Sequence, residues 1–276
     1  MSGEVEFESS SAVATLCGDV LDYAGTFPPA KLGLSEAIER YRQYRSGDDA
    51  WMLNRFLVRA RDLPAFEKAR TEHAPTDTPW PLSVACSDAE DVERACAWRS
   101  ELATVESLEV KTLAAIPDIG CELFVELPLG VSRGELEALH RRGAMLKIRL
   151  GGEPTPTAAA VARILSVCAE LQLPLKATAG LHHAIRSDTH GFLNLVLAAT
   201  LAHQGGDRCE PESAALEALL DETDTTALGF TADSITWREH RFGAAAISDA
   251  RRLFRSFGSC SFEEPLESLE ALGLRP

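Results

Sequence analysis

Lysine is scarce in this chain, and its placement suggests chemistry. The sequence has only five lysines, and arginine supplies the rest of the 27 basic residues. Lys111, Lys147 and Lys176 fall inside the strand-like stretches LEVKTL, AMLKIRL and PLKATA. A buried ammonium group is costly unless it is paired or neutralised, and burial or a neighbouring cation can free a nucleophilic amine. These strand lysines are therefore the first candidates for catalysis.

Lys147 and Lys176 occupy equivalent places in two successive strands, so inward-facing side chains would bring their ammonium groups together. Like charges at close range lower at least one pKa. A neutral Lys147 could then attack a carbonyl group and form a Schiff base, with Lys176 holding the pKa down. Two other interpretations stay open: structural ion pairs with Glu109 and Glu126, and plain binding of an anion. Glu126 is also the natural general acid or base.

Several residues near predicted strand ends suit an anionic substrate. Arg149 shares the face of Lys147 and precedes a glycine pair, and an arginine beside exposed backbone amides can bind a carboxylate or phosphate. Small and hydroxyl residues over 258–261 precede a helix N-terminus, which also favours an anion. A tight turn and an ordinary helix cap are the alternatives. The predicted substrate-binding set is Arg149, Lys111, Arg55, Gly151, Gly180, His183, Arg186, Gly258, Ser259 and Ser261.

The stretch AGLHHAIRSDTH carries His182, His183 and His190, three of the seven histidines. Such a cluster can transfer protons, bind a metal or simply pack. We expect His182 to move protons, with neither a metal nor a cofactor involved. The alternative is a metal-assisted lyase, isomerase or hydrolase that uses all three histidines. Asp22 and the rigid Thr-Phe-Pro-Pro segment after it are second-rank candidates for shaping a pocket.

Strand-like runs alternate with amphipathic helical stretches along the whole chain. The predicted strands cover 21–25, 51–58, 81–86, 108–113, 121–129, 144–150, 174–179 and 255–262. This pattern predicts an α/β fold, a single (β/α)8 TIM barrel over 1–276, with an insertion over 205–242 before the last helix and strand. An open doubly wound sheet is the alternative. In such a barrel the C-terminal ends of the strands form the active site.

Composition narrows the range of partners. The formal net charge of −15 disfavours nucleic acid and membrane surfaces, and the apolar run over 191–202 is too short for a membrane span. The seven cysteines are scattered and contain no Cys-x-x-Cys, which indicates reduced thiols and a cytoplasmic location. We expect a small anionic substrate as the partner and leave a homo-oligomer possible.

Three short stretches resemble class I aldolases of the deoxyribose-phosphate aldolase type. AMLKIRLGG is similar to the sixth strand of that family, LPLKATAGLHH to the seventh and RSFGSCSFEEPL to the eighth. The resemblance implies that Lys147 forms the Schiff base, that Lys176 lowers its pKa, and that Gly258, Ser259 and Ser261 bind phosphate. The family has an acidic residue on its fourth strand, where this chain has LEVKTL. A second hypothesis is a non-catalytic anion-binding barrel.

Overall fold

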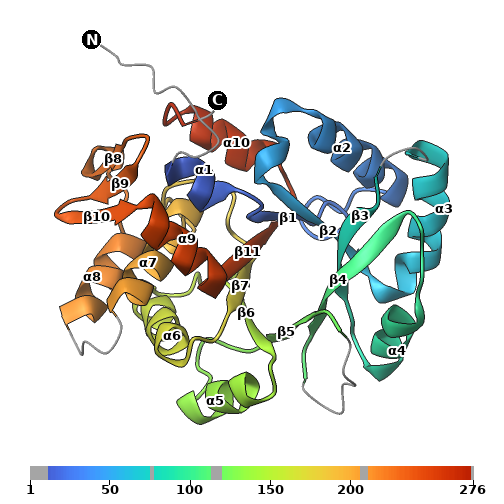
Figure 1. Cartoon of the computed structure of the whole chain (residues 1–276), viewed down its shortest axis with the longest axis horizontal. Helices are drawn as coiled ribbons and strands as arrows, with labels where there is room; N and C mark the ends of the chain where they lie inside the picture. The colour runs from blue at the N-terminus through green and yellow to red at the C-terminus, as the bar shows by residue number, and fades with distance from the viewer. Residues whose placement is uncertain (1–11, 75–77, 113–119, 206–210, 275–276) are drawn as a thin grey trace.

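A closed barrel of eight parallel strands forms the centre of the molecule (Figure 1). The computed structural model describes residues 12–74, 78–112, 120–205 and 211–274. The barrel strands are β1 (Leu21–Tyr23), β2 (Leu53–Arg59), β3 (Trp80–Ala85), β4 (Ala103–Val110), β5 (Glu122–Glu126), β6 (Met145–Arg149), β7 (Leu175–Thr178) and β11 (Phe254–Ser259). Each strand pairs with its neighbour, and β11 closes the ring between β7 and β1. The predicted (β/α)8 barrel is confirmed.

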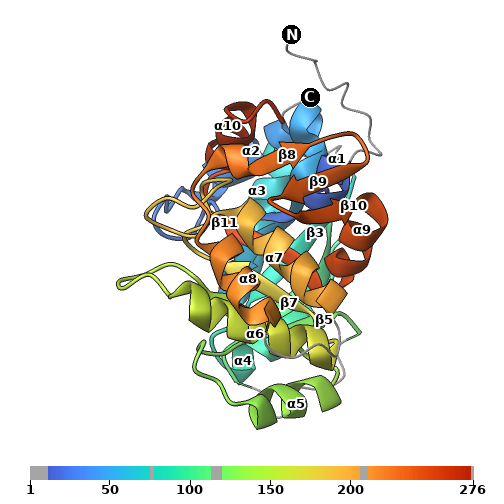
Figure 2. The same ribbon diagram turned by 90° about the vertical axis from the view of Figure 1, so that its left-hand side faces the viewer.

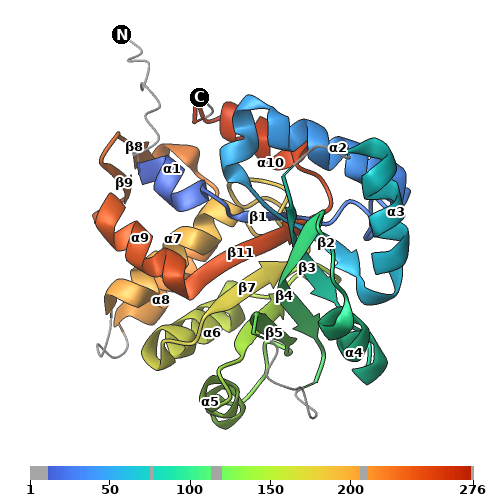
Figure 3. The ribbon, with the colours of Figure 1, turned by 45° about the vertical axis from the view of Figure 1, so that its right-hand side comes forward.

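Helices surround the barrel, as Figure 3 shows from an oblique view. They are α1 (Ala12–Cys17), α2 (Leu34–Ser46), α3 (Leu63–His73), α4 (Ala89–Ala97), α5 (Arg133–Arg141), α6 (Ala158–Leu171), α7 (Phe192–Gly205), α9 (Ala244–Leu253) and α10 (Glu263–Glu270), with short 3-10 turns at Asp48–Met52 and Ala60–Asp62. Helix α7 is apolar almost all round because α6 and α9 cover it on either side.

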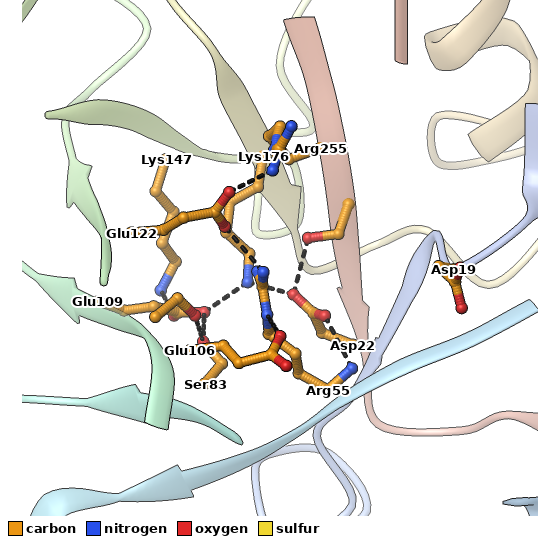
Figure 4. A network of polar contacts seen from close by, with 12 residues as sticks. Asp19, Asp22, Arg55, Ser83, Glu106, Glu109, Glu122, Lys147, Lys176 and Arg255 are labelled. Atoms are coloured by element: carbon orange, nitrogen blue, oxygen red, sulfur yellow. Dashed lines mark hydrogen bonds and ion pairs between the residues drawn. The ribbon is translucent and has the colours of Figure 1, made fainter. Parts of the chain in front are cut away.

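The alternation of residues along β6 and β7 explains how polar side chains come to lie inside a packed barrel. Leu146 and Ile148 are fully buried on one face of β6, and Leu175 and Ala177 on the matching face of β7. Because successive side chains point to opposite faces of a strand, the intervening lysines lie on the other face, toward the barrel axis. The inward direction of both lysines, on which the Schiff-base hypothesis depends, is therefore observed (Figure 4).

The segment predicted as an insertion forms a unit of its own outside the barrel. It contains α8 (Pro211–Leu220), a 3-10 turn (Thr225–Ala227) and an antiparallel sheet of β8 (Leu228–Phe230), β9 (Ser234–Trp237) and β10 (His240–Gly243). The sheet lies beside α1 and α9 (Figure 2). Buried Glu222 joins its parts, because its carboxylate accepts from Trp237 Nε1 at 3.0 Å and Arg238 Nη2 at 2.8 Å. Residues 206–210 of the predicted insertion lie outside the described residues.

The fourth strand begins earlier than predicted and ends before Lys111. We predicted a strand over 108–113, whereas β4 covers Ala103–Val110. The error has a physical reason: Thr104 and Glu106 are exposed or nearly so, and their polar character hid the first half of the strand. As a consequence, Lys111 is an exposed residue just past the strand and not a lysine enclosed by the barrel.

No disulfide bond is present among the described cysteines. The six cysteines among the described residues, Cys17, Cys86, Cys96, Cys121, Cys168 and Cys260, are all free thiols, and Cys209 lies outside the described residues. Within the described ranges, no helix combines the length and the apolar character that a bilayer crossing requires.

Candidate active site

A buried carboxylate, Glu109 on β4, connects the two strand lysines in the middle of the barrel (Figure 4). Lys147 Nζ donates to its Oε2 at 2.6 Å, and Lys176 Nζ donates to its Oε1, also at 2.6 Å. Ser83 Oγ donates to the same Oε1 at 3.0 Å. The two ammonium groups therefore approach each other closely, but a carboxylate lies between them.

Each lysine has a second carboxylate partner. Lys147 also pairs with Glu126, at 2.9 Å, across the β5–β6 pair in which these two residues are opposite each other. Lys176 also pairs with Asp22 of β1, whose Oδ2 accepts from Ser256 Oγ at 2.7 Å as well. The side chains of Lys176 and Asp22 are fully buried, whereas 13% of the Lys147 side chain is exposed. Lys147 is thus the amine that a ligand could reach.

These ion pairs determine the protonation states, and they correct one prediction. Burial by itself lowers the pKa of the Lys147 ammonium, but Glu109 and Glu126 outweigh it and hold that pKa above its usual value. Lys176 behaves in the same way, with Asp22 and Glu109 as the partners. Burial by itself raises the pKa of Glu109, but the two ammonium groups hold that pKa well below its usual range. The prediction that Lys176 lowers the pKa of Lys147 is wrong, because the carboxylate between them favours both charged forms.

A pocket of about 480 Å³ opens above Lys147 at the C-terminal ends of the strands. Glu109 and Lys147 lie at its base. Its walls come from the segments that follow β1, β6, β7 and β11, and from Leu57 of β2 and Ala85 of β3. This is the end of a (β/α)8 barrel at which active sites form. A cavity with a reachable, ion-paired amine at its base is a candidate active site.

Two glycines in the pocket wall are explained by the close approach of the β6 and β7 loops. A Cβ atom on Gly151 would lie 2.8 Å from the Cβ of Ala179, which leaves no room for a side chain. Gly180 has a φ of +73°, a left-handed conformation that favours glycine. These packing requirements bring exposed backbone and Arg149 to the same side of the pocket.

Most of the predicted site residues do come together. Predicted residues that line the pocket are Lys147, Arg149, Gly151, Gly180, His182, Gly258 and Ser259. Lys176 lies beneath them within the ion-pair network, and Glu126 contacts Lys147. Arg149 is exposed and, within the described ranges, makes no ion pair with a carboxylate. It is therefore a cation at the pocket wall that an anionic ligand can use.

Three predicted substrate-binding residues lie elsewhere. Arg55 points into the barrel but toward its N-terminal half, where it pairs with Glu106 at 3.0 Å and Glu122 at 2.8 Å (Figure 4). Lys111 is exposed and is not a pocket-lining residue. Arg186 pairs with Asp221 at 3.2 Å and contacts His190. The structure does not bring these three to the pocket: Arg55 lies deeper in the barrel, β4 ends before Lys111, and Arg186 pairs with the insertion.

Two other predicted residues, His183 and Ser261, line an adjoining pocket between the β7 loop and α10. The Ser261 hydroxyl accepts from the Glu264 N–H at 3.2 Å, although the N-cap residue of α10 is Phe262, whose side chain makes no cap hydrogen bond. His182 borders both pockets and pairs with Glu264 at 2.6 Å. His182 is consequently held at the rim and Ser261 at the start of the terminal helix.

The three histidines of the β7 loop do not form a common site. His190 is fully buried, and its ring nitrogens contact the Pro156 carbonyl at 2.8 Å and Arg186 Nη1 at 2.9 Å. Burial lowers the pKa of His190, which favours its neutral form. In the part of the chain that the structure describes, no group of three or more His, Cys, Asp or Glu side chains is arranged to hold a metal ion. The alternative of a metal site built from these histidines therefore has no geometric basis there.

Two acidic residues have larger roles in the ion-pair network than their sequence positions predicted. Glu109 entered only as a possible ion-pair partner, although it is the residue that joins both lysines. Asp22 was a second-rank candidate, yet it is the fully buried partner of Lys176. The available signal was the same for both: a carboxylate inside a predicted strand of a barrel, where burial of a charge is costly unless a cation faces it.

Together, the fold and the site define the class of this protein as a (β/α)8 barrel with a lysine–carboxylate network under a pocket at the C-terminal ends of its strands. Comparison with models of known protein families finds none that matches this sequence, and comparison with curated proteins finds no significant match.

Proposed function

We propose that the protein is a Schiff-base lyase of the aldolase kind, which acts on a small carbonyl compound bearing a carboxylate or phosphate. The observation that carries the proposal is the position of Lys147. Its amine lies at the base of a pocket, within 2.6 Å of Glu109 and 2.9 Å of Glu126. A reachable amine flanked by two possible proton acceptors suits nucleophilic attack on a carbonyl group.

The first chemical step requires a proton transfer, because the resting state of Lys147 is the ammonium. Lys147 passes one proton to Glu126, whose side chain is 27% exposed and can release that proton to solvent, whereas the two ammonium groups hold Glu109 in its ionised form. The neutral amine then forms a C–N bond with the carbonyl carbon, and the carbonyl oxygen takes a proton by way of Glu126. The nitrogen keeps both of its protons until one of them moves to the leaving hydroxyl group. Loss of water from the resulting carbinolamine gives the iminium, which can accept the electron pair of a breaking carbon–carbon bond.

The rest of the pocket supports an anionic substrate. Arg149 is available at the wall, and the partly exposed glycines Gly151 and Gly180 line the pocket near it. The net charge of −15 and the free thiols favour a small-molecule partner and a reducing, cytoplasmic environment.

The test is reductive trapping with borohydride in the presence of a panel of small aldehydes and 2-oxo acids, read by peptide mass spectrometry. The expected result is a mass increase on the peptide that contains Lys147, with at least one carbonyl compound. The internal control is Lys111, which is exposed and far less enclosed. Labelling of Lys111 to the same extent as Lys147, or no adduct with any compound that binds, would refute the proposal.

The rate of adduct formation should rise with pH. Because Glu109 and Glu126 hold the pKa of Lys147 above its usual value, the neutral amine is a small fraction at pH 7. That fraction grows roughly tenfold for each unit of pH while the pH stays below the pKa. Initial rates measured between pH 7 and pH 9, with borohydride quenching, check this. A rate that is flat over that range would mean that the carboxylates do not protonate Lys147.

A non-catalytic anion-binding barrel is the second candidate, and the ion pairs favour it. Both lysines are held in their charged forms, as in a purely structural network. In that case a 2-oxo acid and the corresponding saturated acid would bind with similar affinity, no adduct would form at Lys147, and the ligand would be recovered unchanged.

A further inference from the structure

The two sides of the pocket above Lys147 differ in chemistry. The side formed by β6, β7 and β11 presents Arg149, Thr178, Ser259 and glycine backbone. The other side is apolar. The loop after β1 contributes four of its residues, β2 one and β3 one: Ala24, Phe27, Pro28, Pro29, Leu57 and Ala85. In the closed barrel β2 lies directly across from β6, so the apolar wall faces the polar one. Neither wall is required for the ion pairs of Lys147.

The apolar wall is held in place by several contacts. The loop after β1 is fastened by the hydrogen bonds from Phe27 N to Ala24 O at 2.8 Å and from Lys31 N to Phe27 O at 2.9 Å. The guanidinium of Arg59, at the end of β2, lies over the Phe27 ring at 4.1 Å, a cation–π arrangement. Both of its terminal nitrogens also reach the Thr26 carbonyl at 3.4 Å. The ring of Phe27 is thus a fixed surface that is only partly buried.

We propose that the ligand is amphiphilic: an anionic or carbonyl head lies beside Arg149 and Lys147, and a short unbranched hydrocarbon chain lies against Phe27 and Leu57. Arg59 is then a positioning residue, because it holds the Phe27 ring and does not itself line the pocket. The inference rests on the proposed function for the identity of the head group, but the apolar subsite can be tested without it.

The proposal depends on the free energy that is gained when the apolar wall of the pocket is removed from water. A fully hydrophilic ligand would fill the polar side and leave the apolar wall hydrated, above all the partly buried Phe27. Each methylene group that becomes buried against them strengthens binding by about fourfold. The pocket volume of about 480 Å³ limits this gain to a chain of a few carbons.

The experiment measures the affinity of the full-length protein for saturated monocarboxylates from acetate to hexanoate by calorimetry. These acids have no reactive carbonyl group, so their binding does not depend on Schiff-base formation. We expect the affinity to rise about fourfold for each added methylene. An affinity that is constant or falls with chain length overturns the apolar subsite.

Substitutions test which side chains cause the dependence of affinity on chain length. Phe27→Ala should flatten the dependence on chain length, whereas Phe230→Ala, a partly buried phenylalanine of the insertion, should leave it unchanged. Arg59→Met should reduce the dependence and Arg59→Lys should restore part of it, while Arg61→Met, whose side chain is 67% exposed, should have no effect. An unaltered dependence in Phe27→Ala, with the fold verified by circular dichroism, would also overturn the proposal.

A parallel series of 2-oxo acids, trapped with borohydride, separates this inference from the proposed function. If the saturated acids show the expected dependence but no 2-oxo acid forms an adduct at Lys147, the amphiphilic subsite stands and the Schiff-base function fails. If adducts form with equal efficiency at every chain length and the saturated acids show no dependence, the function stands and the subsite is refuted.

Discussion

Lys147→Arg is expected to reduce the borohydride-trapped adduct by about 100-fold or more while the protein stays folded. Arginine keeps the positive charge and can still pair with Glu109 and Glu126, but its guanidinium does not lose a proton and cannot form an imine. The variant therefore separates the chemical role of the amine from its electrostatic one. The measurement is intact-protein mass spectrometry after trapping with the best carbonyl compound of the panel.

The control for this variant is Lys111→Arg, which changes an exposed lysine outside the pocket and should leave the adduct unchanged. Circular dichroism and thermal unfolding verify that both variants fold. If Lys147→Arg formed the adduct at the wild-type rate, the nucleophile would be a different amine, and the proposed role of Lys147 would be wrong.

Lys176→Met is expected to lower the free energy of unfolding by about 3–5 kcal/mol, the usual cost of removing one partner from a buried ion pair. The side chain of Lys176 is 1% exposed and that of Asp22 is 0% exposed. Without the ammonium, the donors that Asp22 keeps among the described residues are the Ser256 hydroxyl and the Arg55 backbone N–H. Glu109 still has Lys147 and Ser83. Denaturation by urea at pH 7 measures the change.

Lys111→Met provides the matched control, and a surface change of that kind should alter the free energy of unfolding by less than about 0.5 kcal/mol. The double variant Lys176→Met with Asp22→Asn should be more stable than the sum of the two single effects predicts. Each single variant leaves one buried charge without its partner, whereas the double variant removes both charges of the pair. Strict additivity would show that the two groups do not stabilise each other.

The pH dependence of stability gives an independent readout of the same network. The pKa of Glu109 is lowered in the folded protein. Its contribution to the free energy of unfolding is therefore complete above its unfolded pKa of about 4.3, and it is lost as the pH falls toward the folded pKa. The pKa of Lys176 is raised, so its contribution is complete below about 10.4 and is lost as the pH rises through the folded pKa. Lys176→Met should weaken both trends.

The sequence pattern predicted the barrel because a (β/α)8 fold follows from local features repeated around a ring. Each strand carries a run of buried residues, and each helix carries its own apolar face. The same reasoning placed Lys147 and Lys176 in adjacent strands, and their opposite positions in the β6–β7 pair are observed. It also placed the Thr-Phe-Pro-Pro segment at a pocket, which Phe27, Pro28 and Pro29 do line.

The sequence did not predict how deep along the barrel axis each inward-facing side chain lies. Arg55 and Lys147 both point inward from their strands, but Arg55 pairs with Glu106 and Glu122 in the N-terminal half. The stagger of strands around a barrel determines which residues share a layer, and it is not visible in any single strand. Arg186 lies away from the pocket for a different reason. It pairs with Asp221 of the insertion, a contact between segments that are distant in the sequence.

The sequence by itself determined the architecture and the strand faces, because hydrophobic periodicity is a local property that each segment carries independently. Only the tertiary structure decided the charge state of the amines. Closure of the ring brings Asp22, Glu109 and Glu126 from three different strands to the two lysines, and their attraction exceeds the desolvation that would have neutralised an isolated buried amine. A pKa depends on every charge within a few ångströms, and such neighbours are far apart along the chain until it folds.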